Sequence, residues 1–340
     1  MGNTARSAIR SQGRLSKVMV TGVGGAAGFG LIKTLRKKRD TSVVALDCDP
    51  LASGLHLPGV EAHLTLPTSD SRYFAQLSEL AETTAATALV PTLDEELMVL
   101  ASRGDELSRL GLATWLPSPS TVEKCLDKLL FSKILNDGGI PTPATYLPEE
   151  MGALESMSGF VVKPRTGRGS RDVYRCFTLK QAAAVCELMP NPIIQPLVKG
   201  REFTADCLRW SEGQSVSALR MRDRVKGGMS VVGTTFHDPR VLTAVRHAID
   251  AVMFEGPCCV QGFITTDPQE PVCITEINPR FGGGAVLSEA AGADIMGRYL
   301  DILAGKDVDR DGLRYTSGVS MIRYSDEYFL TAATVGDGSL

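Results

Sequence analysis

Short apolar runs alternate with longer amphipathic stretches along the first third of this chain. The runs at residues 17–21, 42–46, 87–91 and 113–116 predict strands. The amphipathic stretches that end near residue 38, span residues 71–81 and begin at Asp94 predict helices. Strands that alternate with helices indicate a doubly wound parallel sheet of the α/β class. The Pro- and Ser-rich residues 117–120 then indicate a domain boundary.

A different pattern follows this boundary. Residues 121–138 predict a single helix, capped by Ser120 and ended by Gly138. A small α+β unit comes next, with strands predicted at 158–164, 173–177 and 192–197, a basic glycine loop at 165–172 and a helix at 179–189. Beyond it we expect a strand at 201–210, a polar stretch at 220–229, a helix at 238–254, a strand pair within 258–278 and a helix after residue 284. At 340 residues the chain is long enough for two or three domains.

The composition is that of an ordinary globular protein, with 43% hydrophobic residues, 22% charged residues and a net charge of −3. This mildly acidic balance gives no support for nucleic acid as the main partner, which usually requires a basic face. No apolar run approaches the length of a membrane span, so we expect no membrane segment. The polar residues 1–14 lack the apolar core of a secretory signal, and we expect a disordered leader there.

The cysteines and histidines give no sign of a disulfide framework or a zinc site. The eight cysteines are scattered without paired spacing, and the four histidines are dispersed. In a chain of this size the cysteine pattern indicates reduced thiols and a cytoplasmic location.

The most informative stretch is the strand that begins at Val272. Side chains two residues apart on a strand share a face, so Glu276 and Asn278 lie together, and their oxygens suit a hard cation such as Mg²⁺. A turn at residues 267–270 folds the preceding strand back and places Gln261 opposite Glu276 as a third, neutral oxygen ligand. The alternatives are a buried strand that ends in a polar turn, or a bulge that rotates Gln261 away.

Further residues have the chemistry to bind phosphate. Lys163 ends an apolar strand and precedes the basic glycine loop 165–172, whose backbone amides are also available to an anion. Arg280 is a fixed cation that follows Asn278 by two residues. The alternative for Lys163 and its loop is a basic surface hairpin.

The segment 194–204 has the composition of a nucleoside site. Gln195 and the backbone of Leu197 and Val198 would face a base edge, and Glu202 would accept hydrogen bonds from ribose hydroxyls. The alternative is a strand that connects two domains, with Glu202 paired to a nearby arginine.

Taken in chain order, these segments resemble the ATP-grasp superfamily of ATP-dependent carboxylate ligases. The nearest members are the carbamoyl-phosphate-synthetase-like and D-alanine–D-alanine-ligase-like enzymes. The resemblance covers residues 16–324 and rests on Lys128, Lys163, the segment from Gln195 to Glu202, Gln261 and the motif from Glu276 to Arg280.

This resemblance implies an ATP-grasp fold of two α+β subdomains, preceded by a Rossmann-like domain. The implied divisions are a leader at 1–15, the Rossmann-like domain at 16–119, a linking helix at 120–140, a lid subdomain at 141–197, a C-terminal subdomain with the metal site at 198–325 and a tail at 326–340.

The resemblance also implies roles for individual residues. The implied ATP ligands are Lys128, Lys163, Arg165, Ser170, Gln195, Pro196, Leu197, Val198 and Glu202. The implied metal ligands are Gln261, Glu276 and Asn278, and the implied catalytic residues are Lys163 and Arg280. The implied substrate residues are Gly24, Gly25, Arg222, Lys226, Arg280, Gly282 and Gly283.

The activity that follows is ADP-forming ligation with ATP and Mg²⁺, or Mn²⁺ in its place. A small-molecule carboxylate attacks the γ-phosphate, and an amine then displaces phosphate from the acyl phosphate. The basic stretch 220–226 favours an acidic substrate, with a solvated strand edge as the alternative. A homodimer through the N-terminal domain is a further expectation of the resemblance.

Two other functions compete with this one. The turn at residues 22–28 approximates the dinucleotide fingerprint, and Asp47 has the spacing of a ribose ligand, so an NAD(P)-dependent oxidoreductase is one alternative. The other is an ATP-grasp kinase-like phosphotransferase with a hydroxyl acceptor.

Overall fold

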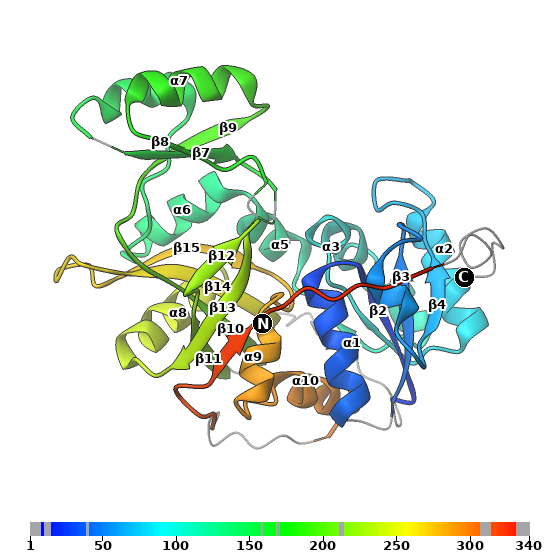
Figure 1. The fold of residues 1–340 in the computed structure, drawn as a ribbon. Helices are drawn as coiled ribbons and strands as arrows, with labels where there is room; N and C mark the ends of the chain where they lie inside the picture. Colours follow the sequence, from blue (N-terminus) through cyan, green and yellow to red (C-terminus); the bar gives the residue numbers. More distant parts are fainter. Residues whose placement is uncertain are drawn as a thin grey trace, which may run out of the picture.

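The computed structural model describes residues 8–9, 15–38, 41–157, 159–167, 169, 171–210, 214–306 and 314–330. Figure 1 shows an N-terminal domain on the right, a small subdomain at the top and a large sheet on the left, with helices below and between them. None of the helices in the described parts of the chain is long and apolar enough to cross a membrane.

The N-terminal domain is built on a four-stranded parallel sheet in the order β4-β3-β2-β5, as the alternating pattern predicts. Alternate strand residues supply two separate cores. Val18 and Val20 face one cluster, whereas Met19 faces the other. The elements of this domain are β2 (Lys17–Thr21), α1 (Ala26–Lys38), β3 (Ser42–Asp47), η1 (Ser53–His56), β4 (Glu61–Leu64), α2 (Tyr73–Thr84), β5 (Ala88–Val90), α3 (Asp94–Ala101), α4 (Gly104–Arg109) and β6 (Thr114–Trp115).

Two expectations for the segments that flank this domain were wrong. Residues Ala8–Ile9 form a short strand, β1, that pairs with β6, so this part of the expected leader is not disordered. Residues 121–138 form two helices, α5 (Pro119–Leu126) and α6 (Lys128–Asp137), because Asp127 adopts an extended backbone between them. The Asp127 side chain caps α6, and Ser118 rather than Ser120 caps α5.

The small subdomain has the predicted α+β composition. Its antiparallel sheet runs in the order β8-β7-β9 and is covered by α7. The buried cluster between them is centred on Phe160, Val162 and Ile194. Its elements are η2 (Pro148–Leu154), β7 (Phe160–Pro164), β8 (Tyr174–Cys176), α7 (Leu179–Leu188) and β9 (Pro192–Pro196).

The large sheet is antiparallel and runs in the order β12-β13-β11-β10-β14-β15, with β16 paired to β13. The polar stretch expected at 220–229 is in fact the end of one strand, a second strand and the start of a third. Helix α8 packs on one face of the sheet, and α9 and α10 pack on the other. The elements are β10 (Gly200–Trp210), β11 (Gln214–Met221), β12 (Arg224–Lys226), β13 (Met229–Phe236), α8 (Pro239–Ala251), β14 (Gly256–Thr265), β15 (Val272–Asn278), α9 (Ala285–Ala290), α10 (Ile295–Leu303) and β16 (Ser320–Ile322).

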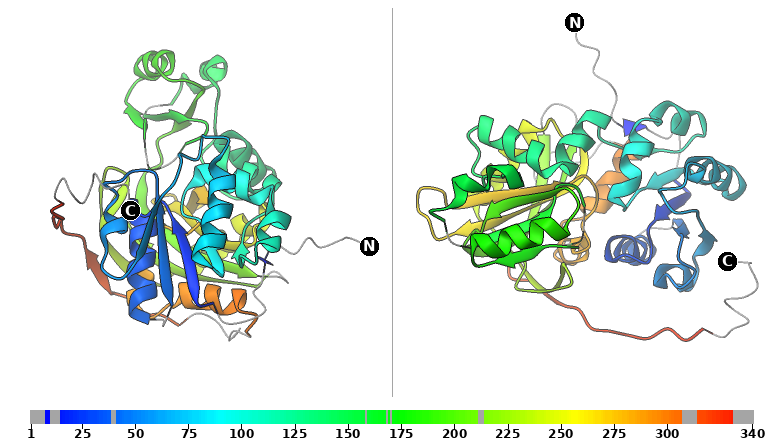
Figure 2. Two further views of the ribbon diagram at one scale, coloured as in Figure 1. Left: turned by 90° about the vertical axis from the view of Figure 1, so that its right-hand side faces the viewer. Right: turned by 90° about the horizontal axis from the view of Figure 1, so that it is seen from above.

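One hydrophobic cluster spans the N-terminal domain and the large sheet. Val20 of β2 and Trp210 of β10 belong to the same buried cluster, together with Tyr299 of α10. After β16 the chain runs as an extended strap, residues 323–330, past α1 towards the N-terminal sheet (Figures 1 and 2). The ring of Tyr328 on this strap lies 5.8 Å from the ring of His56. The small subdomain stands apart from this combined body.

Candidate active site

The hairpin of β14 and β15 brings the three expected metal ligands onto one face. Gln261 lies directly opposite Glu276, the predicted register. A bulge does occur, but between Gln261 and Gly262, with Thr275 as the extra residue. The bulge offsets a turn that is one residue tighter than the predicted one, so it aligns Gln261 with Glu276 instead of rotating it away.

The donors on this hairpin fit a magnesium ion that keeps phosphate oxygens among its ligands. The Asn278 Nδ2 donates to Glu276 Oε1 at 2.9 Å, which leaves the Asn278 amide oxygen for a cation. Within the parts of the chain that the structure describes, no group of three or more His, Cys, Asp and Glu side chains is placed to hold a metal. One carboxylate and two amides suit a cation that arrives with its own phosphate ligands.

The charges of two lysines act on the Glu276 carboxylate. Lys163 on β7 is buried, and burial lowers its pKa to about 8, although the Glu276 carboxylate opposes this shift. Burial also lowers the pKa of Lys128, at the start of α6, and again Glu276 opposes. Burial alone would raise the pKa of Glu276, but Lys163, the Asn278 hydrogen bond, Lys128 and Arg222 together bring it below its usual value. An anion placed here would compensate two partly desolvated cations.

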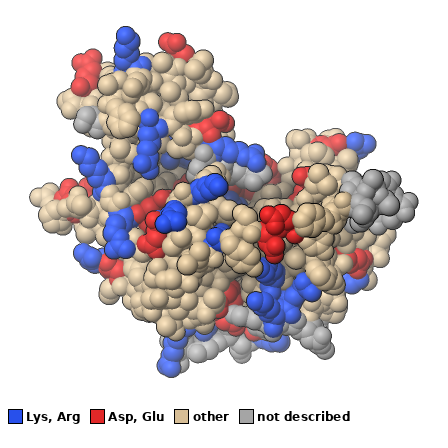
Figure 3. Space-filling model, in the orientation of Figure 1, with Lys and Arg blue, Asp and Glu red and all other residues tan. Residues whose placement is uncertain are grey.

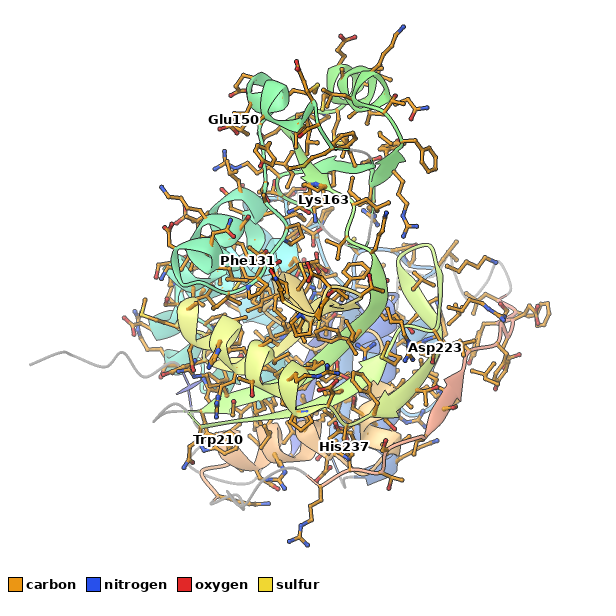
Figure 4. All side chains as sticks on the ribbon, turned by 90° about the vertical axis from the view of Figure 1, so that its left-hand side faces the viewer. Phe131, Glu150, Lys163, Trp210, Asp223 and His237 are labelled. Carbon is orange, nitrogen blue, oxygen red and sulfur yellow. The ribbon has the colours of Figure 1, made fainter. Side chains whose placement is uncertain are left out.

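Figure 4 shows Lys163 at the lower edge of the small subdomain, facing the large sheet. Figure 3 shows acidic and basic side chains gathered in the hollow between these two parts.

Residues 165–167, at the start of the basic glycine loop, pack against the start of α6. The Lys128 Nζ donates to the carbonyl of Gly167 at 3.0 Å. Arg165, expected to bind phosphate, instead forms an ion pair with Asp127, with its Nη2 2.6 Å from Asp127 Oδ2. Ser170, the other expected phosphate ligand of this loop, lies outside the described residues.

The expected nucleoside segment runs between the small subdomain and the large sheet. Gln195 is buried and its Nε2 donates to Thr145 Oγ1 at 2.7 Å, while the Leu197 amide donates to the carbonyl of Gly159. Glu202 forms an ion pair with Arg222 at 2.8 Å, which is the arginine pairing named above as the alternative. Pro196 and Val198 lie on the same segment, which leads from β9 of the small subdomain to β10 of the large sheet.

Arg280 is held from the N-terminal domain. Its Nη2 donates to Asp94 Oδ2 at 2.8 Å. Asp94 begins α3, and the loop before it is fixed by the buried Glu96 carboxylate, which accepts from the amides of Thr92 and Leu93. The guanidinium therefore has a fixed direction before any ligand binds.

A cavity of about 200 Å³ connects these groups to the N-terminal domain. Its walls include the expected residues Gly25, Arg222, Arg280, Gly282 and Gly283. Two other expected substrate residues lie elsewhere, since Lys226 is exposed on β12 and the Gly24 amide donates to Asp47 Oδ2 at 2.8 Å. Gln261, Glu276 and Asn278 also line this cavity, so the metal hairpin and the substrate residues share one space.

Two features of this region argue against other chemistry. Asp47 accepts from the amides of Gly24 and Asp49, so it braces the glycine turn instead of facing a free ribose. Burial raises the pKa of Cys259, which lines the cavity, to about 12, so this thiol is not an activated nucleophile.

Two family models match separate parts of the chain. The model for the PylC-like N-terminal domain matches residues 18–114, and a model described as ATP-grasp in the biosynthetic pathway with Ter operon matches residues 188–325. Residues 188–325 are thus similar to an ATP-grasp domain. A search of curated proteins finds no significant match.

Solved ATP-grasp structures share the fold at low sequence identity. N5-carboxyaminoimidazole synthetase from Staphylococcus aureus, complexed with ADP, is 14% identical, with a TM-score of 0.72 over 92% of this chain and 83% of that one. Biotin carboxylase from Campylobacter jejuni is 13% identical, with a TM-score of 0.69 over 88% and 73% of the two chains. The L-amino acid ligase from Bacillus licheniformis is 18% identical, with a TM-score of 0.66 over 85% and 74%. None of these comparisons supports the oxidoreductase alternative.

Sequence reasoning missed the partners of the residues at this site. Asp94 was assigned only to the start of a helix and Glu96 was given no role, yet they orient Arg280 and the loop beside the cavity. Asp206 was also missed, although it holds Arg220 from the neighbouring strand. The available signal was Asp206 itself, an acid within the buried part of β10, because a charge in such a run requires a partner.

Proposed function

We propose that this protein is an ADP-forming ligase that uses ATP and Mg²⁺ to join a small-molecule carboxylate to an amine. The observation that carries the proposal is that Gln261, Glu276 and Asn278 line one cavity with Arg280, while Lys163 and Lys128 act on Glu276 from the small-subdomain side. Phosphoryl transfer depends mainly on positioning and charge neutralisation, and these groups provide both.

The side chains divide the work between phosphate and carboxylate. Lys163 and Lys128 would bind the phosphates of ATP, with the segment from Gln195 to Glu202 along the nucleoside. Gln261, Glu276 and Asn278 would hold Mg²⁺, which would neutralise phosphate charge when bound. Mn²⁺ prefers the same oxygen ligands and belongs to the same proposal.

The reaction then proceeds in two displacements. A carboxylate oxygen of the substrate attacks the γ-phosphorus, and the bond to ADP breaks. The amine nitrogen attacks the acyl carbon, inorganic phosphate leaves, and the amine proton passes to phosphate or water. Arg280, already oriented by Asp94, would stabilise the negative charge that develops on the acyl phosphate.

The domain divisions given above belong to this proposal, with residues 120–140 as a helix pair instead of one helix. A cytoplasmic location and a homodimer through the N-terminal domain also stay proposals. All eight cysteines are free thiols, which supports a reducing compartment.

The test is a screen of carboxylates and amines with Mg-ATP, read by ADP release and by the mass of the product. A ligase yields ADP, phosphate and an amide, whereas a kinase-like enzyme retains the phosphate on its product. Lys163→Ala and Glu276→Ala should each abolish ADP release while leaving the circular dichroism spectrum unchanged. Full activity in either variant would refute the proposed site.

A further inference from the structure

Glycines form much of the wall of the cavity beside the metal hairpin. They face it from four places: Gly22 and Gly25, Gly169, Gly227 and Gly228, and residues 282–284. A Cβ on Gly284 would lie 2.4 Å from Arg220 Nη1, so the glycine allows the guanidinium to reach this wall. The cavity volume of about 200 Å³ is enough for a compact small molecule.

Arg220 is the most deeply buried cation of this wall. Its side chain is 3% exposed, and its Nε and Nη2 donate to the two oxygens of Asp206 at 2.8 and 3.1 Å. Ser288 fixes the other side of the pair, because its Oγ donates to Asp206 Oδ2 at 2.6 Å. A buried ion pair contributes little to stability compared with apolar packing. Its position at a cavity wall therefore points to a ligand.

The charges around the cavity favour an anion. Arg222 and Arg280 also line it, and each is paired with an acid that does not, Glu202 and Asp94 respectively. Among the described residues that line the cavity, Glu276 is the single carboxylate, and it faces the two lysines. The N-terminus of α1 opens on the same space and adds a positive partial charge.

We propose that this cavity binds a second carboxylate, distinct from the one that is phosphorylated, and that Arg220 is its ligand. The inference rests on the proposed function, since it names a substrate class for the same site. The phosphorylated carboxylate lies with Arg280 and the metal hairpin, and the second lies against Arg220. This second group has two sources: a dicarboxylic donor, or an amino acid that serves as the amine.

Matched acid and amide probes separate these sources. With Mg-ATP and the wild-type protein, ADP release is compared for succinate and succinamate as donors, and for glycine and glycinamide as amines. Calorimetry with Mg²⁺ and a nonhydrolysable ATP analogue measures the binding of the same four molecules without turnover. We expect the acid to exceed its amide in at least one pair by about tenfold or more, as for loss of a charge-assisted hydrogen bond.

Two variants connect the effect to Arg220. Arg220→Lys keeps the charge but loses the fork that bridges Asp206 and the ligand, and should raise the KM for the preferred acid by about 10- to 100-fold without changing the KM for ATP. Gly284→Ala leaves both Arg220 and Asp206 in the chain and should act in the same direction, because its methyl would lie 2.4 Å from Arg220 Nη1 and displace the guanidinium. Arg209→Lys is the control, since Arg209 pairs with Asp250 at 2.5 Å on the same sheet and lies outside the cavity lining.

Each outcome decides the proposal. A preference for glycine over glycinamide, or for succinate over succinamate, supports it and names the source of the carboxylate. Binding of the acid alone in calorimetry supports it even without turnover. Equal use of acid and amide with normal ADP release overturns the second-carboxylate site and leaves the ligase intact. Absence of nucleotide binding and of discrimination in both assays overturns both proposals.

Discussion

Replacement of Lys163 by methionine should stabilise the ligand-free protein while it removes nucleotide binding. The Lys163 side chain is buried, and burial lowers its pKa from 10.5 to about 8, with Glu276 opposing. A shift of this size corresponds to about 3 kcal/mol, the unfavourable free energy of keeping the ammonium charged in the folded protein at pH 7. Methionine removes this charge and retains most of the aliphatic packing.

The sign of the pH dependence follows from the same shift. Between about pH 8 and 10.5 the unfolded chain binds more protons at Lys163 than the folded protein does, so the contribution of Lys163 to stability rises with pH there. We therefore expect Lys163→Met to be about 2–3 kcal/mol more stable than wild type at pH 7, with a difference about 1 kcal/mol smaller at pH 9. The expected gain at pH 7 is somewhat smaller than the value of about 3 kcal/mol given above, because Glu276 loses a charged partner when Lys163 is replaced.

Urea unfolding of both proteins at pH 7 and pH 9 measures these differences. Mg-ATP should raise the Tm of wild type and leave that of the variant unchanged. Lys133→Met, on the exposed side of α6, is the matched control and should shift neither quantity. A variant less stable than wild type at pH 7, or a difference independent of pH, would refute the view that Lys163 is a desolvated cation that an anionic ligand stabilises.

Three further predictions test the neighbours of this lysine. Gln261→Ala should raise the Mg²⁺ concentration for half-maximal activity on the order of tenfold, the lower end for loss of a supporting group at a metal site, and an unchanged magnesium titration would contradict its role. Asp94→Asn should lower kcat roughly tenfold with the KM for ATP unchanged, because Arg280 loses its charged partner, and a change in KM alone would argue against orientation. Glu96→Gln should lower the free energy of unfolding by about 1–3 kcal/mol, because an amide nitrogen would face donors such as the Tyr73 hydroxyl or the Leu93 amide. Tyr73→Phe removes one of these hydrogen bonds and should give a smaller loss in the same urea titration.

Local chemistry explains which parts of this site were predictable from sequence. The pairing of Gln261 with Glu276 followed from a turn and an alternation of side chains, both of which operate over fewer than 20 residues. The turn was placed one residue off, and a bulge at Thr275 compensated, so the register was right although its local cause differed.

Contacts between distant segments explain what the sequence could not show. Asp127 breaks the linking helix because it both caps α6 and binds Arg165, which lies 38 residues further along. Neither residue alone predicts that pairing. Arg220 contributed to the interpretation of residues 220–229 as a polar stretch. In the structure it is buried, because its partner Asp206 lies on the adjacent strand.

The strap at residues 323–330 has a consequence for how the parts of this protein are connected. Arg323 donates to the carbonyls of Ser230 and Gly283, and Tyr328 contacts His56. The strap therefore joins β13, the glycines at residues 282–284 and the N-terminal domain. Together with the Arg280–Asp94 pair and the shared core, the strap ties these parts into one unit. The chain enters the small subdomain at residues 141–145 and leaves it at residues 196–199. We therefore expect nucleotide exchange to depend on these two connections.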